Sequence, residues 1–372
     1  MKLRGESRTA KRGMSLPELM VGLAVGMFVA TVAISTFVST RTLNVVNSSS
    51  TRMTENARLA TETLHTDLRS AGFAGCRTLE QRLDGPPVVV LSGGLNAGFI
   101  TEGNSGVRGS SGTGTAHSPA LPTAIATART SVTPNLPAPL LDSDVVSVRV
   151  PADNIGLGLV SSMGSTSASP QLQAGLAENP IAQGDVVLIS NCKAAAIFQI
   201  TSATPGGTAG NGVLAHDTGT LTPGNSSTDL QHVFRSDASV YRMQTRHYYV
   251  APSVLRAGTN SLWRLTVPAP AGGSPLPEEV ASGIDRLVVS FGIDTDVAPD
   301  LNVNQYMAAS AVADWERVLS ARVQMLAATA ETRTAQQPSR TFTFFDGSTQ
   351  TKTDQRLRTL LSEVVTLRNG AP

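Results

Sequence analysis

Oxygen-bearing side chains gather in one short stretch, DTDVAPDLNVN, between residues 294 and 304. Carboxylate and amide oxygens are the ligands that calcium prefers in proteins. The candidate ligands are Asp294, Asp296, Asp300, Asn302 and Asn304. Their spacing differs from an EF-hand loop, whose central glycine and distal glutamate are absent here. Two interpretations stay open: a calcium site, or a solvated Asp/Asn turn between two strands.

The other groups that could do chemistry are scattered. No second histidine or cysteine lies within five residues of any of the five histidines, which are His65, His117, His216, His232 and His247. The sequence has no GxSxG nucleophile elbow, no HExxH zinc motif and no GxxxxGK[ST] phosphate loop. We therefore expect no catalytic residues, no enzyme activity and no cofactor apart from the calcium considered above.

The positive charge of the chain is concentrated at its N-terminus. The formal net charge is +1, yet residues 1–13 hold five basic side chains against one glutamate, Glu6. Once this segment is set aside, no basic face is left for nucleic acid, and we expect no direct nucleic-acid partner.

An apolar run follows directly, GMSLPELMVGLAVGMFVATVAISTFV from Gly13 to Val38, with Glu18 as its single carboxylate. The residues from Leu19 to Val38 are uncharged and long enough to cross a hydrocarbon core of about 30 Å. The basic leader favours the cytoplasm, which places the body of the chain in the periplasm or outside. No ordinary signal-peptide cleavage site follows the run, so we expect the segment to be retained.

Glu18 admits two interpretations. It could sit at the membrane interface in the first turn of a helix, where a carboxylate favours the helix dipole and Pro17 is tolerated. Alternatively, it lies in an apolar setting and pairs with a positive charge, because two opposite charges buried together cost far less than either alone.

The helical pattern continues beyond the membrane segment. Apolar or small residues recur every three or four positions, at Leu43, Val46, Ser50, Met53, Ala57, Ala60 and Leu64. Gly72 then favours a helix end. We expect one helix from Met14 to about Ala71, with a transmembrane half over 14–38 and an amphipathic half over 39–71.

Residues 72–372 are predicted to form a β-rich globular domain. Strand-like runs begin at residues 86, 144, 185, 195, 239, 261, 285, 317, 340 and 362. Leu319, Ala321, Val323 and Met325 would share one face of an antiparallel sheet. Residues 354–364 could instead form a short helix. The Gly/Ser-rich stretch of about 92–139 is expected to be a surface loop or mobile insertion.

The chain has two cysteines, Cys76 and Cys192. A body outside the inner membrane would favour a disulfide between them, and two buried free thiols are the alternative.

The N-terminal arrangement resembles the class III signal of type IV prepilins, in which a short basic leader ends in glycine and an apolar run carries glutamate at its fifth position. The resemblance implies that a prepilin peptidase cleaves after Gly13 and methylates Met14, where most members of the family have phenylalanine. It also implies that Glu18 pairs with the N-terminal amine of a neighbouring subunit and sets the register between helices.

Several segments of the body resemble the PilW family of minor pilins: RSAGFAGC (69–76), GDVVLISNCKAAAIFQIT (184–201), YRMQTRHYYVA (241–251), GIDRLVVSFGIDTD (283–296), WERVLSARVQMLAA (315–328) and RLRTLLSEVVTLRN (356–369). This resemblance implies an α+β, type IV pilin-like fold with the long helix packed on an antiparallel sheet. It also supports pairing of Cys76 with Cys192, because the family has cysteines at comparable places.

The resemblance further implies a minor pilin that waits in the inner membrane with a periplasmic body and then joins the pilus, at its tip. There it would start polymerisation with other minor pilins and the major pilin, and present a tip adhesin. Pili of this kind serve cell adhesion, twitching motility or DNA uptake. A J-type pseudopilin of a type II secretion tip is the alternative within the superfamily. A membrane-anchored periplasmic enzyme or calcium-binding module is the alternative from another class.

Overall fold

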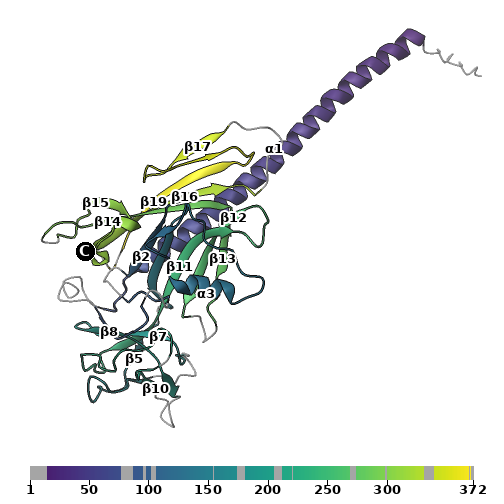
Figure 1. Ribbon diagram of the computed structural model, residues 1–372. Helices are drawn as coiled ribbons and strands as arrows, with labels where there is room; N and C mark the ends of the chain where they lie inside the picture. Colours follow the sequence, from purple (N-terminus) through teal and green to yellow (C-terminus); the bar gives the residue numbers. More distant parts are fainter. Residues whose placement is uncertain are drawn as a thin grey trace, which may run out of the picture. The chain divides into compact units, whose positions relative to one another are not determined.

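The computed structural model describes residues 15–76, 87–94, 98–101, 106–153, 155–173, 181–204, 212–219, 221–268, 274–297, 300–330, 339–367 and 369. The chain divides into two compact units, Met1–Thr51 and Arg52–Pro372. One helix, α1 (Leu16–Ser70), contributes its first part to the first unit and its last turns to the second (Figure 1). The predicted long helix is confirmed to within two residues at its N-terminal end and one at its C-terminal end.

The amphipathic part of α1 buries one face in the core of the second unit. Met53, Ala57, Ala60, Leu64 and Leu68 are spaced three or four residues apart and are each at most 8% exposed. Each fully buried leucine of this kind contributes about 1.5–3 kcal/mol through removal of apolar surface from water. This packing, which the sequence predicted for the first four of these residues, holds the helix on the β domain.

The large sheet of the second unit contains ten strands: β1 (Val88–Val89), β2 (Val107–Gly112), β3 (His117–Ser118), β4 (Val145–Pro151), β5 (Leu157–Gly158), β7 (Val186–Ser190), β8 (Ala195–Gln199), β11 (Ser239–Pro252), β12 (Asn260–Val267) and β13 (Glu278–Ser282). Its long central strand, β11, pairs antiparallel with β4, β5, β7 and β12. Only β1 and β8 form a parallel pair among the described strands.

A second sheet, here called the C-terminal sheet, has four antiparallel strands in the order β15-β14-β16-β19. They are β14 (Ile284–Ile293), β15 (Gln305–Ala308), β16 (Val318–Ala328) and β19 (Arg358–Thr366). Ala321, Val323 and Met325 of β16, three of the four residues predicted to share a face, line the core that the helix shares with both sheets. Leu319 is not part of this core, because the pairing with β14 shifts register beside it. The result is an α+β architecture with a largely antiparallel β domain.

The outer face of the C-terminal sheet is partly covered as well. A hairpin consists of β17 (Arg340–Thr343) and β18 (Thr349–Lys352). Phe344, in the turn between these strands, packs against Val288 and Leu326. For this reason Gln324, on the outer face of β16, is only 8% exposed and accepts a hydrogen bond from the Phe345 amide at 2.9 Å.

The remaining elements lie around these two sheets. A three-stranded sheet consists of β6 (Gln171–Leu172), β9 (Ser202–Thr204) and β10 (Gly212–Ala215), and it shares a core with β7 and β8 (lower part of the domain in Figure 1). Among the described residues, the short helices are α3 (Thr123–Thr130), η3 (Ala309–Ala311) and η4 (Trp315–Arg317).

Two expectations from the sequence are wrong. The stretch 92–139 is not a simple surface loop, because it contains β2, which pairs with β4, and the helix α3. The helix considered for 354–364 is absent: residues from Arg358 onward form β19, whose nine-residue pairing with β16 outweighs the local helical pattern.

Candidate functional site

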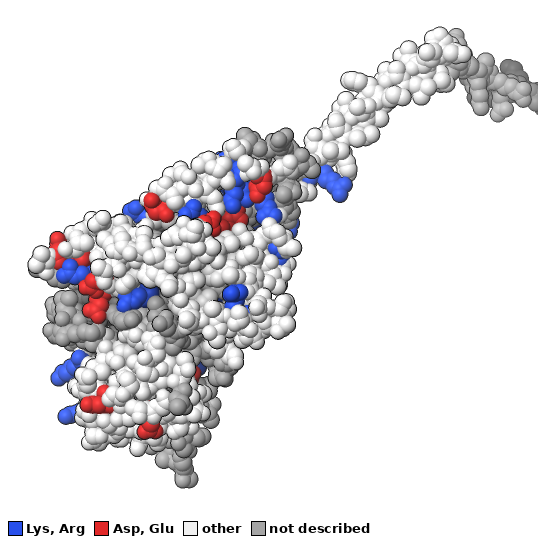
Figure 2. Space-filling model, viewed as in Figure 1, with Lys and Arg blue, Asp and Glu red and all other residues white. Residues whose placement is uncertain are grey.

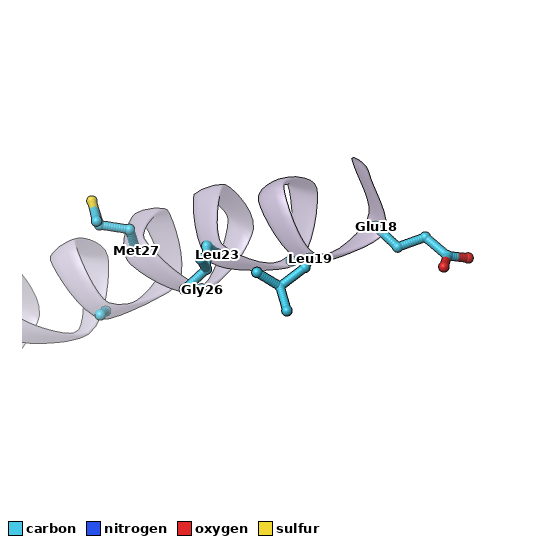
Figure 3. Close-up of a pocket in the computed structure, with 7 residues that line it drawn as sticks. Glu18, Leu19, Leu23, Gly26 and Met27 are labelled. Carbon is cyan, nitrogen blue, oxygen red and sulfur yellow. The ribbon is translucent and has the colours of Figure 1, made fainter. Parts of the chain in front are cut away.

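Glu18 lies in the first turn of α1 (Figure 3), and its carboxylate reaches back to Ser15, which is one half of a capping box. Its carboxylate accepts hydrogen bonds from the backbone amide and the hydroxyl of Ser15, both at 2.9 Å. The pattern Ser-x-x-Glu at a helix start is readable in the sequence, although the prediction overlooked it. The predicted processing residues Gly13 and Met14 lie outside the described residues.

A shallow groove runs along α1 from Glu18. Its floor is formed by Gly22 and Gly26, where an added Cβ atom would meet no other atom within 4 Å. Leu19, Leu23, Met27 and Ala30 line the rest of the groove. Small residues on one helix face allow a second helix to approach closely in an apolar setting. The carboxylate and the groove therefore lie together on a surface that a neighbouring helix could occupy.

The same helix has the length and composition of a membrane span. Among the described residues it is the one helix that qualifies, with a mean hydropathy of 2.2 over its most apolar 18 residues, none of which is buried. The first part of α1 shows almost no charge in Figure 2, whereas Lys, Arg, Asp and Glu are interspersed on the visible face of the β domain.

A disulfide joins Cys76 and Cys192, as the sequence favoured. Cys76 follows the end of α1, and Cys192 follows β7, with 116 positions between them. Next to the bridge, the hydroxyl of Ser190 donates to the carbonyl of Ala74 at 2.8 Å. Gly75 has a φ of +74°, and a Cβ there would collide with Ser190. This corner of the chain is thus tied to the large sheet by covalent and polar contacts.

A buried charge cluster also links α1 to the large sheet. Asp67 is 5% exposed and accepts hydrogen bonds from Arg246 at 2.7 Å and from the Tyr248 hydroxyl at 2.5 Å. Burial and the Asp67 charge raise the pKa of Tyr248, so its proton stays in place. Because 179 and 181 positions separate these partners, the sequence alone gave no signal for them.

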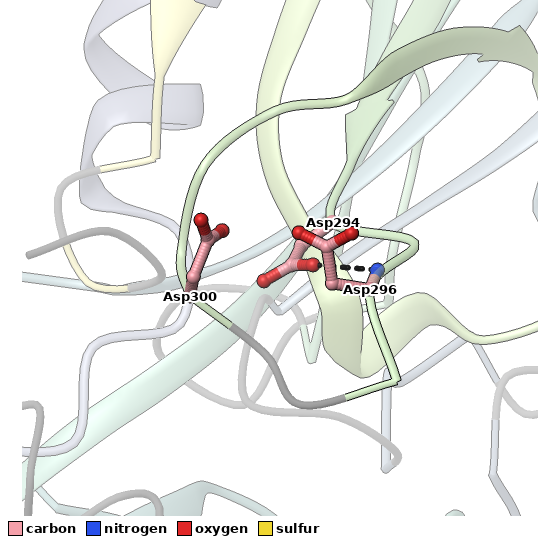
Figure 4. Close-up of side chains that lie close together, drawn as sticks. All are labelled: Asp294, Asp296 and Asp300. Atoms are coloured by element: carbon pink, nitrogen blue, oxygen red, sulfur yellow. Dashed lines mark hydrogen bonds between the residues drawn. The ribbon is translucent and has the colours of Figure 1, made fainter.

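The loop after β14 brings three of the five proposed calcium ligands together (Figure 4). Ligand oxygens of Asp294, Asp296 and Asp300 lie within 4.8 Å of one another. Asp294 is 1% exposed and accepts the amides of Asp296 at 3.0 Å and Leu301 at 2.8 Å, which folds the loop back on itself. These carboxylates could hold a hard cation.

The two proposed amide ligands serve the loop itself. The side-chain oxygen of Asn304 accepts the Thr295 amide at 2.6 Å. The Asn302 amide donates to Asp300 at 2.8 Å, and this contact lowers the pKa of the Asp300 carboxyl. An Asp/Asn turn therefore explains the hydrogen bonds of the loop without an ion, and both interpretations from the sequence stay open.

His247 resembles one half of a catalytic pair but is sealed in the core. Its Nδ1 lies 2.7 Å from the Ser147 hydroxyl and its Nε2 lies 2.9 Å from the carbonyl oxygen of Gly98, which fixes Nε2 as the donor. Burial lowers the pKa of His247 to about 4, so the ring is neutral. With His247 at 0% and Ser147 at 3% exposure, no substrate can reach the pair, and its role is structural.

The N-terminal helix α1 is long and apolar enough to cross a membrane, and its amphipathic half packs on a largely antiparallel β domain. These two features define the class of the protein as α+β with a helix that could serve as a membrane anchor. Residues 247–369 match the family model PilW, described as type IV pilus-assembly protein W. Over this region, which includes the whole C-terminal sheet, the chain is similar to the PilW family of type IV pilus-assembly proteins. No curated protein and no solved structure matches the chain.

Proposed function

We propose that this chain is a minor pilin that helps to initiate type IV pilus assembly, in a tip complex with other minor pilins and the major pilin. The observation that carries the proposal is Glu18 in the first turn of an exposed apolar helix, in a chain whose C-terminal region matches a pilus-assembly family. The match to a pilus family also favours a pilus over a type II secretion tip.

In this proposal, a prepilin peptidase removes residues 1–13 and methylates Met14. The new N-terminal amine of one subunit then meets Glu18 of the next. The groove of Gly22 and Gly26 beside Glu18 supports this step, since it lets two helices come close enough for charges to pair. The body waits on the periplasmic side of the inner membrane and later joins the pilus, where it could carry a tip adhesin. The assembly role requires no cofactor and no catalytic group.

The first test is the intact mass of the membrane-extracted protein from cells with and without prepilin peptidase. We expect a peptidase-dependent loss of residues 1–13, a gain of one methyl group, and two hydrogens fewer because of the disulfide. An uncut N-terminus in cells with active peptidase would leave a simple membrane anchor and refute the pilin proposal.

The second test separates processing from assembly. We expect Glu18→Gln to leave cleavage intact but to reduce piliation strongly, because the neutral amide cannot neutralise a neighbouring amine. Glu55→Gln is the matched control, since Glu55 is exposed on the amphipathic part of the same helix. Full piliation with Glu18→Gln would contradict the proposed role of the carboxylate.

A further inference from the structure

The outer edge of β19 is a long strand edge with no hydrogen-bonded neighbour in the part of the chain that the structure describes. All nine residues of β19, Arg358–Thr366, pair with β16 without a register shift, and the C-terminal sheet ends at β19. At about 3.4 Å per residue, such an edge presents roughly 30 Å of backbone.

Alternate residues of β19 carry the free backbone groups. The Leu367 amide donates to the carbonyl of Leu319, and the Thr329 amide donates to the carbonyl of Leu357. In this antiparallel register, the odd-numbered residues therefore direct their N–H and C=O groups toward β16. The groups that point away from β16 belong to the even-numbered residues Arg358, Leu360, Ser362, Val364 and Thr366.

The end strands of the large sheet and the opposite end of the C-terminal sheet are protected in the usual ways against unwanted pairing, by shortness or by charge. β1 and β3 have two residues each, β15 has four, and β13 carries Glu278 and Glu279 among its five. β19 is longer and contains neither proline nor lysine. Its two charged residues are paired within the domain, Arg358 with Asp285 and Glu363 with His65, and its exposed residues are the uncharged Ser362, Val364 and Thr366. Val364 is 53% exposed, which is high for a β-branched apolar residue.

We propose that the edge of β19 is a docking site for an extended strand of a different subunit of the same pilus. This inference rests on the proposed function and names one contact through which the subunit joins its complex. An extended peptide is the occupant that fits, because only a strand offers N–H and C=O groups at the spacing of this edge.

The faces of β19 define the chemistry of that strand. On the α1 side, its side chains would meet Glu363 and His65, which contact each other. On the opposite side, they would meet Val364 and Leu360, the latter packed with the aromatic residues of the β17–β18 hairpin. The fitting segment therefore alternates polar and apolar residues over about five positions.

A second copy of this chain fits the edge poorly. α1 runs along β19 in the same direction, because His65 contacts Glu363 and the Asn369 side chain donates to the carbonyls of Ser70 and Ala71. Antiparallel pairing of two β19 edges would set the two α1 segments in opposite directions, against a shared membrane orientation. Parallel pairing would turn one sheet over and bring apolar Val364 beside the Glu363 side of the other copy.

The test uses the full chain with a photo-cross-linking phenylalanine derivative in place of Ser362, recovered from sheared pili. The same probe in place of Thr351, exposed on β18, is the control position. We expect the Ser362 probe to join a peptide of another pilus subunit and the Thr351 probe to leave that peptide unlabelled. A cross-link to β19 of a second copy would overturn the choice of partner, and absence of any cross-link would overturn the docking edge.

Two variants test whether the cross-link depends on hydrogen bonds between the backbone of β19 and the partner strand. Val364→Pro removes one outward N–H without removing a bond to β16, whereas Val364→Thr keeps that N–H. We expect the proline variant to lower the cross-link yield about ten-fold and the threonine variant to keep it. Equal yields from both would refute pairing through the backbone.

Amide exchange on the unaltered protein tests the same edge without a risk of misfolding. The Val364 amide should exchange quickly in detergent and slowly in pili, and rapid exchange in both would refute the inference. If the chain is present in pili with a processed N-terminus but this edge stays open, only the inference fails. If the chain is absent from pili, the proposed function fails and the inference falls with it.

Discussion

Removal of the disulfide gives a prediction whose magnitude follows from the structure. Cys76 and Cys192 are 116 positions apart, so the bridge closes a loop that holds much of the large sheet. The chain-entropy relation for a loop of this length gives about 5 kcal/mol of stabilisation at 25 °C, through restriction of the unfolded chain. We expect Cys76→Ser/Cys192→Ser to lower the free energy of unfolding by about 3–5 kcal/mol, within the usual range for native bridges.

The assay is urea unfolding of the full chain in detergent, followed by circular dichroism, for the oxidised protein, the reduced protein and the double variant. Reduction and substitution should give similar losses, and the denaturant dependence should rise as the unfolded chain expands. Ser190→Ala is the matched control, because it removes the neighbouring hydrogen bond to Ala74 and should cost only about 1 kcal/mol. A loss below about 1 kcal/mol for the double variant would refute the argument from loop closure.

Two further predictions concern the core and the joint between the sheets. Leu64→Ala should lower the free energy of unfolding in urea by about 2–5 kcal/mol, because Leu64 is 1% exposed. Leu59→Ala should change it little, because Leu59 is 51% exposed on the same helix. Equal losses for the two variants would contradict the packing of α1. Burial raises the pKa of Asp144, which accepts the amides of Gly112 and Val289, to about 6. The contribution of Asp144 to the free energy of unfolding should be fully present below pH 4 and should fall by about 3 kcal/mol as the pH rises through 6. Asp144→Asn should remove this fall. Parallel pH profiles of the free energy of unfolding for the two proteins would contradict this prediction.

Local sequence signals predicted the elements that depend on local geometry. The spacing of Met53, Ala57, Ala60 and Leu64 identified the buried face of α1, because helical residues three and four apart share one face. Glu18 and the apolar run around it were also identified, since they lie within neighbouring residues, although the contact between Glu18 and Ser15 was overlooked. The three clustered aspartates were readable for the same reason, because one loop holds them all.

Two predictions failed where tertiary contacts outweighed local preference. The Gly/Ser-rich segment reads as a loop, yet Gly109 lies in β2, which pairs with β4. A Cβ atom on Gly109 would come within 2.6 Å of the Phe291 ring. Small residues are required at that point for the two sheets to approach. In the same way, the residues after Arg358 favour a helix locally, but pairing with β16 makes them a strand.

The sequence by itself determined the membrane-type helix, the position of Glu18 and the β-rich character of the body. Those properties follow from residues close together in the chain. Only the tertiary structure decided which distant groups meet: Asp67 with Arg246 and Tyr248, and the free edge at β19. Such contacts depend on how the two sheets pack against one helix. The spacing of neighbouring residues does not identify contact partners that lie more than a hundred residues away in the sequence.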